Sequence, residues 1–150
     1  KHKYEHVNIG MNSRLDTLQA AILINKINIL GDEIIKRNEI ANFYNSSLKD
    51  SHYILPKTSK HKSYAWAQYT LRHKERDEII NFLNSNGIPT GIYYPIPLNQ
   101  QPAYKDCFVV SSGIANSEKF CKEVFSIPMS PYLKKEQQIY IIENLLLATN

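Results

Sequence analysis

The sequence is poor in the residues that build metal sites and disulfide frameworks. Its 150 residues include only two cysteines, Cys107 and Cys121, and their spacing matches neither a disulfide framework nor a zinc site. The five histidines show no spacing typical of metal ligands. The sequence therefore predicts no bound metal, and its cysteine content fits the reducing cytoplasm.

Long apolar runs and a strong charge bias are also missing. No run of about 18 apolar residues is present to span a membrane, and no signal peptide is recognisable. The net charge is +4, from 18 basic and 14 acidic residues, which indicates little about partners. The densest basic stretch, residues 57–62, has no nucleic-acid-binding motif beside it, so a solvated loop is the simpler interpretation. We expect neither a membrane protein nor a nucleic-acid-binding protein.

The remaining composition is that of a globular domain. An apolar share of 43% and a charged share of 21% are ordinary for a folded protein. A chain of 150 residues fits one domain with a real core. The chain opens at Lys1 without a methionine and stays polar up to Gly10. This start suggests a piece of a longer polypeptide.

The apolar pattern predicts a helix-rich order of elements. Residues 12–48 carry apolar side chains at three- and four-residue spacings and predict a long helix in the core or at a dimer interface. Ser13 and Asp16 resemble a capping box, and Gly31 predicts a kink or a break. The rest predicts strands over 65–71 and 90–94, an extended piece over 125–128, and helices over 75–86, 117–124 and 134–147. We therefore predict an α/β (α+β) layer, with a long N-terminal helical segment packed on a small sheet.

The segment Gly10-Met-Asn-Ser-Arg14 stands directly before the expected helix. The free N–H groups and partial positive charge of a helix N-terminus suit a phosphate. Asn12 and Arg14 add a neutral and a charged donor for the same anion. Asn and Arg are also common turn and surface residues near helix starts, and the residues alone leave that alternative open.

A tyrosine pair followed by a proline-rich loop is the second candidate site. Tyr93 and Tyr94 end an expected strand, and Pro95 and Pro97 stiffen the connection that follows, so the hydroxyls point in a fixed direction. The alternative is a buried aromatic pair, which physical arguments alone favour. No cysteine–histidine pair, glycine-rich phosphate loop or nucleophile elbow accompanies these segments. The residues indicate parts of a ligand site without a catalytic centre.

Several segments match known motifs in order along nearly the whole chain. Residues 10–23 are similar to G-x-N-x-R-L-D-x-L-Q-A-A, and residues 94–104 are similar to Y-P-x-P-L-H-x-Q-x-A-Y. Weaker matches are R-x-x-I-A-x-x-Y at 37–44, R-D with L and G-I at 76–88, S-E at 117–118 and S-I-P-M at 126–129. Together they resemble the DegT/DnrJ/StrS family of nucleotide-sugar aminotransferases, which depend on pyridoxal 5'-phosphate (PLP).

The resemblance implies an enzyme of fold type I that moves an amino group, usually from glutamate, onto a nucleotide-linked keto sugar. Residues 1–150 correspond to the C-terminal small domain with the connecting and dimer helices, and the PLP-binding large domain lies N-terminal to them. Family members are homodimers with active sites at the subunit interface. This implies cofactor-binding roles for Asn12 and Arg14 and substrate-binding roles for Arg14, Tyr93, Tyr94 and Asn99. The tyrosine pair and residues 65–69 favour a UDP-linked acetamido sugar.

This sequence departs from the family pattern in two ways. Many members have histidine at the positions of Tyr93 and Asn99, and neither replacement can change charge near neutral pH. The family's Schiff-base lysine lies N-terminal to this segment, so no catalytic residue is predicted here and the chain alone is expected to be inactive. A non-catalytic dimerisation or interaction module and a PLP-dependent sugar dehydratase of the same fold remain alternatives.

Overall fold

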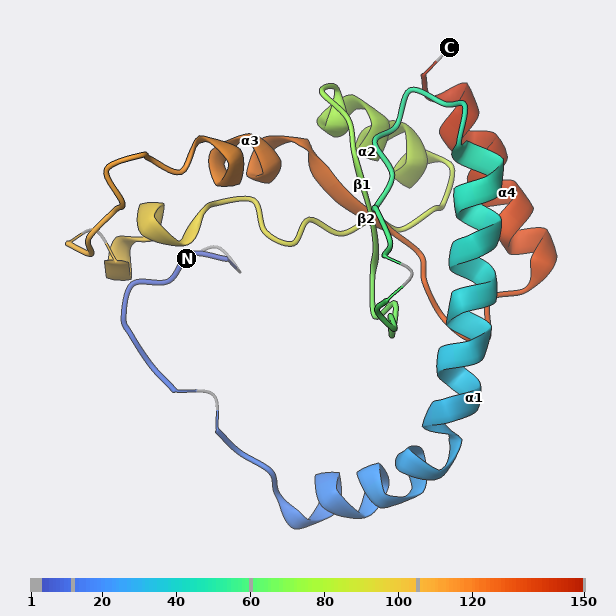
Figure 1. The fold of residues 1–150 in the computed structure, drawn as a ribbon, viewed down its shortest axis with the longest axis horizontal. Coiled ribbons are helices and arrows are strands. Elements are labelled where there is room, and N and C mark those ends of the chain that lie inside the picture. Colours follow the sequence, from blue (N-terminus) through green and yellow to red (C-terminus); the bar gives the residue numbers. More distant parts are fainter. Residues whose placement is uncertain (1–3, 12, 60, 105, 150) are drawn as a thin grey trace.

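A computed structural model describes residues 4–11, 13–59, 61–104 and 106–149 of the chain. Figure 1 shows its helices and the small sheet at which they meet. In chain order the elements are α1 (Thr17–Leu48), β1 (Tyr69–Arg72), α2 (Arg76–Ser85), the short 3-10 helices η1 (Leu98–Gln100) and η2 (Pro102–Tyr104), α3 (Ala115–Glu123), β2 (Val124–Ile127) and α4 (Lys135–Leu147). The expected mixture of long helices with a small sheet is confirmed.

The sheet consists of β1 and β2, which pair antiparallel with Tyr69 opposite Ile127 and Arg72 opposite Val124. Isolated bridges extend both edges, since Ile54 pairs with Arg72 and Gly91 pairs with Ser126. The expected strand over 90–94 is thus wrong, because only Gly91 reaches the sheet. Prolines at 89 and 95 flank this segment, and they cannot donate to a ladder.

The expected strand over 65–71 is shorter than predicted because Trp66 adopts a φ of 45°. That left-handed conformation ends an extended run. It also turns the indole towards α1, where Trp66 Nε1 donates to Asn38 Oδ1 at 3.0 Å. The Trp66 ring packs between the rings of Tyr64 and Tyr69, each with its centroid 5.5 Å away. Packing against α1 therefore replaces strand pairing before Tyr69.

The core lies between the sheet, helices α2 and α4, and the last turns of α1. Its fully buried larger side chains are Tyr44, Leu48, Tyr69, Leu71, Ile79, Leu83, Phe125 and Leu145. Tyr44 Oη donates to the Pro128 carbonyl at 3.0 Å, and Tyr53 Oη donates to the Leu145 carbonyl at 2.8 Å. Burial raises the pKa of each phenol above the ordinary range for tyrosine. These tyrosines therefore pack as neutral core residues with satisfied hydroxyls.

Helix α1 begins later than expected and runs through Gly31 as one continuous helix, so the expected break is absent. Figure 1 shows that the helix nevertheless bends part-way along its length, as the alternative of a kink implies. Its cap is Asp16, whose Oδ1 accepts from Gln19 N at 2.8 Å while Gln19 Oε1 accepts from Asp16 N at 3.4 Å. The capping box predicted from Ser13 and Asp16 is therefore wrong, because Asp16 reaches the free N–H groups of the first turn itself. In Figure 1 the first half of α1 extends away from the sheet, and only its last turns join the core.

Candidate functional site

A buried glutamine joins the N-terminal segment to the loop that carries the tyrosine pair. The Gln101 side chain donates from Nε2 to the Tyr4 carbonyl at 2.9 Å and accepts at Oε1 from His6 N at 3.0 Å. Ala103 N donates to the His6 carbonyl at 2.9 Å. Gln101 is only 4% exposed. In Figure 1 the N-terminal segment accordingly lies beside the loop that follows Tyr94.

This junction encloses an open pocket of about 410 Å³, lined by Tyr4, His6, Tyr94, Ile96, Leu98 and Gln101. The Tyr94 ring meets the Tyr4 ring edge-on, with centroids 6.1 Å apart, and meets the Tyr93 ring in the same way at 6.1 Å. Tyr94 remains 62% exposed. The buried aromatic pair that the residues alone favoured is therefore wrong, and Tyr94 presents an aromatic wall to solvent.

Sequence reasoning missed Tyr4, His6 and Gln101 as parts of this pocket. Tyr4 and His6 carry no signal in the sequence, because it is hydrogen bonds between their backbone groups and the distant Gln101 side chain that bring them to the pocket. Gln101 did carry a signal, since it lies in the 94–104 motif, but only the structure shows that its amide forms hydrogen bonds with Tyr4 and His6. The lining of this pocket is thus set by long-range contacts rather than by local sequence.

Tyr93 lines a separate pocket of about 240 Å³, beside Gly91 and Ser126. A Cβ at Gly91 would lie 2.7 Å from Cε2 of the Tyr93 ring. The glycine therefore allows the ring to approach the backbone closely. Tyr93 is 40% exposed, so its ring is available to a ligand.

Asn99 lines a third pocket of about 430 Å³ together with Tyr104, Phe108 and Ile114. Its Oδ1 is buried and has no hydrogen-bond partner among the residues that the structure describes. A buried acceptor without a partner is costly, which makes this oxygen receptive to a donor. Tyr93, Tyr94 and Asn99 thus lie on one loop but line three different pockets within this chain.

Asn12 lies outside the described residues, and Arg14 lies on the exposed segment before α1. The Arg14 guanidinium has no ion pair or hydrogen bond within the described ranges, and it lines none of the pockets that hold Tyr93, Tyr94 and Asn99. The Asp16 carboxylate occupies the N-terminus of α1, where the sequence suggested a phosphate. Arg14 itself still fits a phosphate, since a free guanidinium is a strong donor to that group.

A buried arginine, Arg76, joins α2 to the end of α3 and the start of β2. Arg76 begins α2, and its Nη1 donates to the Cys121 carbonyl at 2.7 Å and to the Val124 carbonyl at 3.3 Å. Its Nε donates to Asp77 Oδ1 at 2.7 Å. The guanidinium thereby satisfies carbonyls at the end of α3 and the start of β2. The R-D motif at 76–77 has a structural role in this chain.

The described residues contain no group of three or more His, Cys, Asp or Glu side chains that could hold a metal ion. They also contain no helix that is long and apolar enough to cross a membrane.

Comparison with known proteins identifies a consistent set of relatives. The model of the DegT/DnrJ/EryC1/StrS aminotransferase family matches residues 1–146. The UDP-2-acetamido-2-deoxy-3-oxo-D-glucuronate aminotransferase of Pseudomonas aeruginosa is 41% identical over 87% of this chain and 36% of its own length. The dTDP-3-amino-3,6-dideoxy-alpha-D-galactopyranose transaminase of Aneurinibacillus thermoaerophilus is 39% identical over 94% of this chain and 38% of its own length.

Solved structures agree with these relatives. A DegT/DnrJ/EryC1/StrS aminotransferase from Brucella abortus superimposes with a TM-score of 0.87 and 41% identity, covering 100% of this chain and 40% of that one. DesV of S. venezuelae superimposes with a TM-score of 0.85 and 32% identity, covering 100% of this chain and 41% of that one. The chain therefore spans about two-fifths of the length of the relatives it matches.

Proposed function

The chain belongs to the DegT/DnrJ/EryC1/StrS aminotransferase family, and from this premise we propose that it forms the C-terminal small domain and dimer helices of a PLP-dependent sugar aminotransferase. The observation that carries the proposal is the family match over residues 1–146. The full enzyme transfers an amino group from glutamate to a nucleotide-linked keto sugar. Because the relatives are about two and a half times as long, the PLP-binding domain and its lysine belong to the part that this chain does not contain.

The sugar in this proposal is a UDP-linked acetamido sugar. Two relatives carry names that specify such a substrate, one from Pseudomonas aeruginosa and one from Acidithiobacillus ferrooxidans, at 41% and 33% identity. Relatives that act on dTDP-linked sugars by name are 39% and 33% identical. The relative at 41% identity is one of the UDP-linked class, and this supports the proposed sugar.

On the cofactor side, PLP supplies an electron sink for the amino transfer when it is bound. We assign Arg14, with its free guanidinium, to the phosphate of the cofactor or the ligand, since charge-assisted hydrogen bonds to phosphate are strong. Asn12 remains a proposed second donor to the same group. These residues bind and orient, and neither is assigned a proton transfer.

On the substrate side, we assign Tyr93, Tyr94 and Asn99 to the sugar nucleotide. Tyr94 offers a flat ring and a hydroxyl at the mouth of its pocket. Asn99 offers a buried carbonyl oxygen that lacks a partner among the described residues. An asparagine keeps its donors and acceptor at every pH, whereas a histidine changes charge near neutrality. Asn99 therefore contributes positioning and not proton transfer.

The experiment that tests the proposal compares the complete product of the reading frame with residues 1–150 alone. Both are supplied with PLP, glutamate and either UDP-linked 3-oxo acetamido sugar or a dTDP-linked keto sugar, and formation of 2-oxoglutarate is followed. We expect activity only from the complete protein, and higher kcat/KM with the UDP-linked sugar.

Other outcomes lead to the alternatives. Activity of residues 1–150 alone would contradict the assignment of the lysine to the missing part. Loss of a sugar hydroxyl without consumption of glutamate would identify a dehydratase. A complete product without PLP binding would favour a non-catalytic interaction module.

A further inference from the structure

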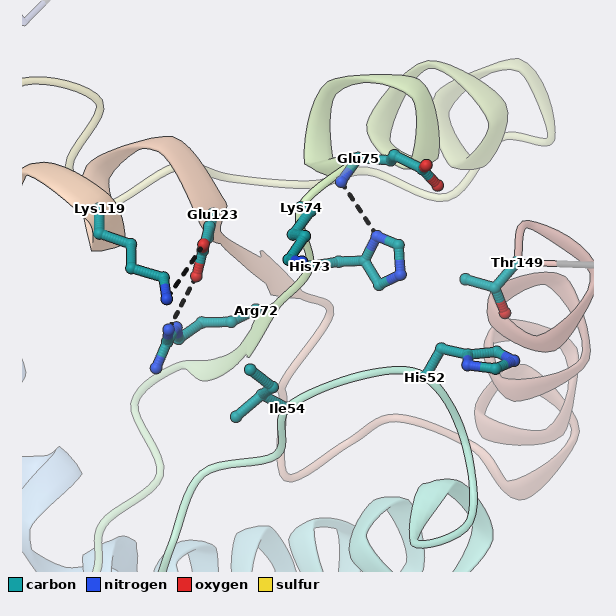
Figure 2. A pocket seen from close by; sticks show the side chains of 9 residues that line it. All are labelled: His52, Ile54, Arg72, His73, Lys74, Glu75, Lys119, Glu123 and Thr149. Carbon is teal, nitrogen blue, oxygen red and sulfur yellow. Dashed lines mark hydrogen bonds and ion pairs between the residues drawn. The ribbon is translucent and has the colours of Figure 1, made fainter.

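A further pocket, lined mostly by polar side chains, lies at the opposite end of β1 from the aromatic segment around Trp66 (Figure 2). It has a volume of about 450 Å³ and brings together four segments that are distant in sequence: the turn after α1, the end of β1 with the start of α2, the last turns of α3, and the end of α4. Its lining residues are His52, Ile54, Arg72, His73, Lys74, Glu75, Lys119, Glu123 and Thr149. None of the residues assigned to sugar or cofactor is among them.

Cationic side chains outnumber carboxylates in this pocket. Arg72, Lys74 and Lys119 face only Glu75 and Glu123, and two histidines add further nitrogen atoms. Glu123 neutralises Arg72 and Lys119 together, with Arg72 Nη2 at 2.7 Å and Lys119 Nζ at 3.9 Å from its two oxygens. Two cationic side chains thus share one carboxylate, which leaves an excess of positive charge on the side of the pocket formed by Arg72 and Lys119.

The Arg72 guanidinium is also incompletely satisfied. Its Nε is buried and has no hydrogen-bond partner in the described part of the chain. The Phe120 ring covers one face of the guanidinium, with Arg72 Cζ 3.9 Å from the ring centroid, and the side chain as a whole is still 22% exposed. An arginine with one carboxylate and an unpaired Nε favours additional negative charge nearby.

The opposite wall supplies oriented donors. His73 Nδ1 accepts from Glu75 N at 3.1 Å, which places the ring proton on Nε2 as a donor. Figure 2 shows the His73 ring turned towards the side of the pocket where His52 and Thr149 lie. Lys74 and His52 have no hydrogen bond or ion pair within the described ranges. The free donors therefore come from several directions around one volume.

We propose that this pocket, formed by Arg72, His73, Lys74 and Lys119 with His52 and Thr149, is a binding site for a phosphate group. Donors that converge from different segments suit a tetrahedral dianion better than a planar carboxylate, which is matched by a single fork of parallel donors. The ligand class is inorganic phosphate or a small phosphate monoester.

The test uses the complete protein with its cofactor site saturated with PLP, so that the cofactor's own phosphate site is filled. Inorganic phosphate is titrated by calorimetry at constant ionic strength, with succinate as a dicarboxylate of similar charge. The double variant Lys74→Gln/Lys119→Gln removes two pocket cations. Lys62→Gln/Lys122→Gln removes the same charge from exposed positions that do not line the pocket.

We expect saturable phosphate binding that the pocket variant weakens at least about tenfold, since each charge-assisted hydrogen bond contributes at least that factor. The control variant should retain wild-type affinity, and circular dichroism should show both variants folded. Equal weakening by both variants would indicate a general charge effect and overturn the proposal. Tighter binding of succinate, or no saturation by phosphate, would overturn it as well. None of these outcomes depends on aminotransferase activity.

Discussion

Gln101 illustrates how one side chain can position a site that it does not itself form. Its amide is used at both ends, donating to the Tyr4 carbonyl and accepting from His6 N. Backbone groups that lose such a partner in a buried place cost free energy. The N-terminal segment therefore depends on Gln101 for its place beside Tyr94.

Replacement of Gln101 by leucine should release the N-terminal segment without unfolding the core. Hydrogen exchange at His6 should increase, and the KM for the sugar nucleotide should rise while far-ultraviolet circular dichroism stays unchanged. The loss of two hydrogen bonds predicts a cost of about 1–3 kcal/mol in local opening. Gln100→Leu is the matched control, because Gln100 is exposed and its side chain, among the described residues, bonds only to Glu118. Unchanged exchange at His6 in the Gln101 variant would contradict this role.

At the scale of the element, α1 combines a helix that the sequence specifies well with a glycine that weakens it. Gly31 lies in the middle of the helix, and a Cβ built there meets nothing within 4 Å. Glycine in a helix interior loses more backbone entropy on folding than alanine does. The helix continues through Gly31 although glycine disfavours a helix interior, and good helix formers such as Leu30 and Glu33 lie close to it on either side.

Gly31→Ala should therefore stabilise the fold by about 0.5–1 kcal/mol, measured as a shift of the urea midpoint. Gly87→Ala is the control, because its surroundings are equally open but its φ is +72°. That substitution should destabilise the protein by about 1 kcal/mol, since a side chain in the left-handed region is strained. A destabilising Gly31→Ala would mean instead that this face of α1 is packed in solution.

The helices were predictable because their apolar spacing is regular, and α2, α3 and α4 lie close to the expected ranges. The strands were less predictable than the helices. Residues 65–68 have strand-like composition, but the hydrogen bond from Trp66 to Asn38 and the stacking on Tyr69 override it. The start of α1 was also mispredicted, because Asp16 rather than Ser13 supplies the N-terminal cap. Propensity fails where a distant side chain offers a better partner.

The candidate site was only partly predictable for the same reason. The motif at 94–104 identified a loop, and the structure shows that its residues Tyr94 and Asn99 line separate pockets. Tyr4 and His6 reach the pocket because their backbone groups form hydrogen bonds with Gln101, which is distant in the sequence. No local sequence pattern encodes such a contact. The role of Arg14 stays a prediction.

At the scale of the whole molecule, α1 exposes apolar side chains that this chain does not cover. Its first half carries a group of isoleucines and leucines, each about half or more exposed: Leu18, Ile22, Leu23, Ile24, Ile27 and Leu30. Apolar surface of this extent is unusual on a monomer. It supports the proposal that α1 takes part in a homodimer.

Residues 1–150 alone should therefore self-associate, and the mass measured by light scattering should rise with concentration. Ile24→Glu/Ile27→Glu places two charges on one helical face, at positions 67% and 68% exposed, and should shift the chain towards the monomer. Asn25→Glu/Asn28→Glu adds the same charge at polar positions of the same helix and should leave association intact. If both double variants dissociate equally, net charge rather than the apolar face controls association.

The Trp66 stack also has a practical consequence for spectroscopy. Trp66 is the only tryptophan in the chain, and it lies between Tyr64 and Tyr69 with ring centroids 5.5 Å away on either side. Energy absorbed by these tyrosines can therefore be transferred to a single indole, whose emission wavelength depends on its surroundings. A shift of that emission to longer wavelength would report the moment at which this segment leaves α1, in a chain that needs no added label.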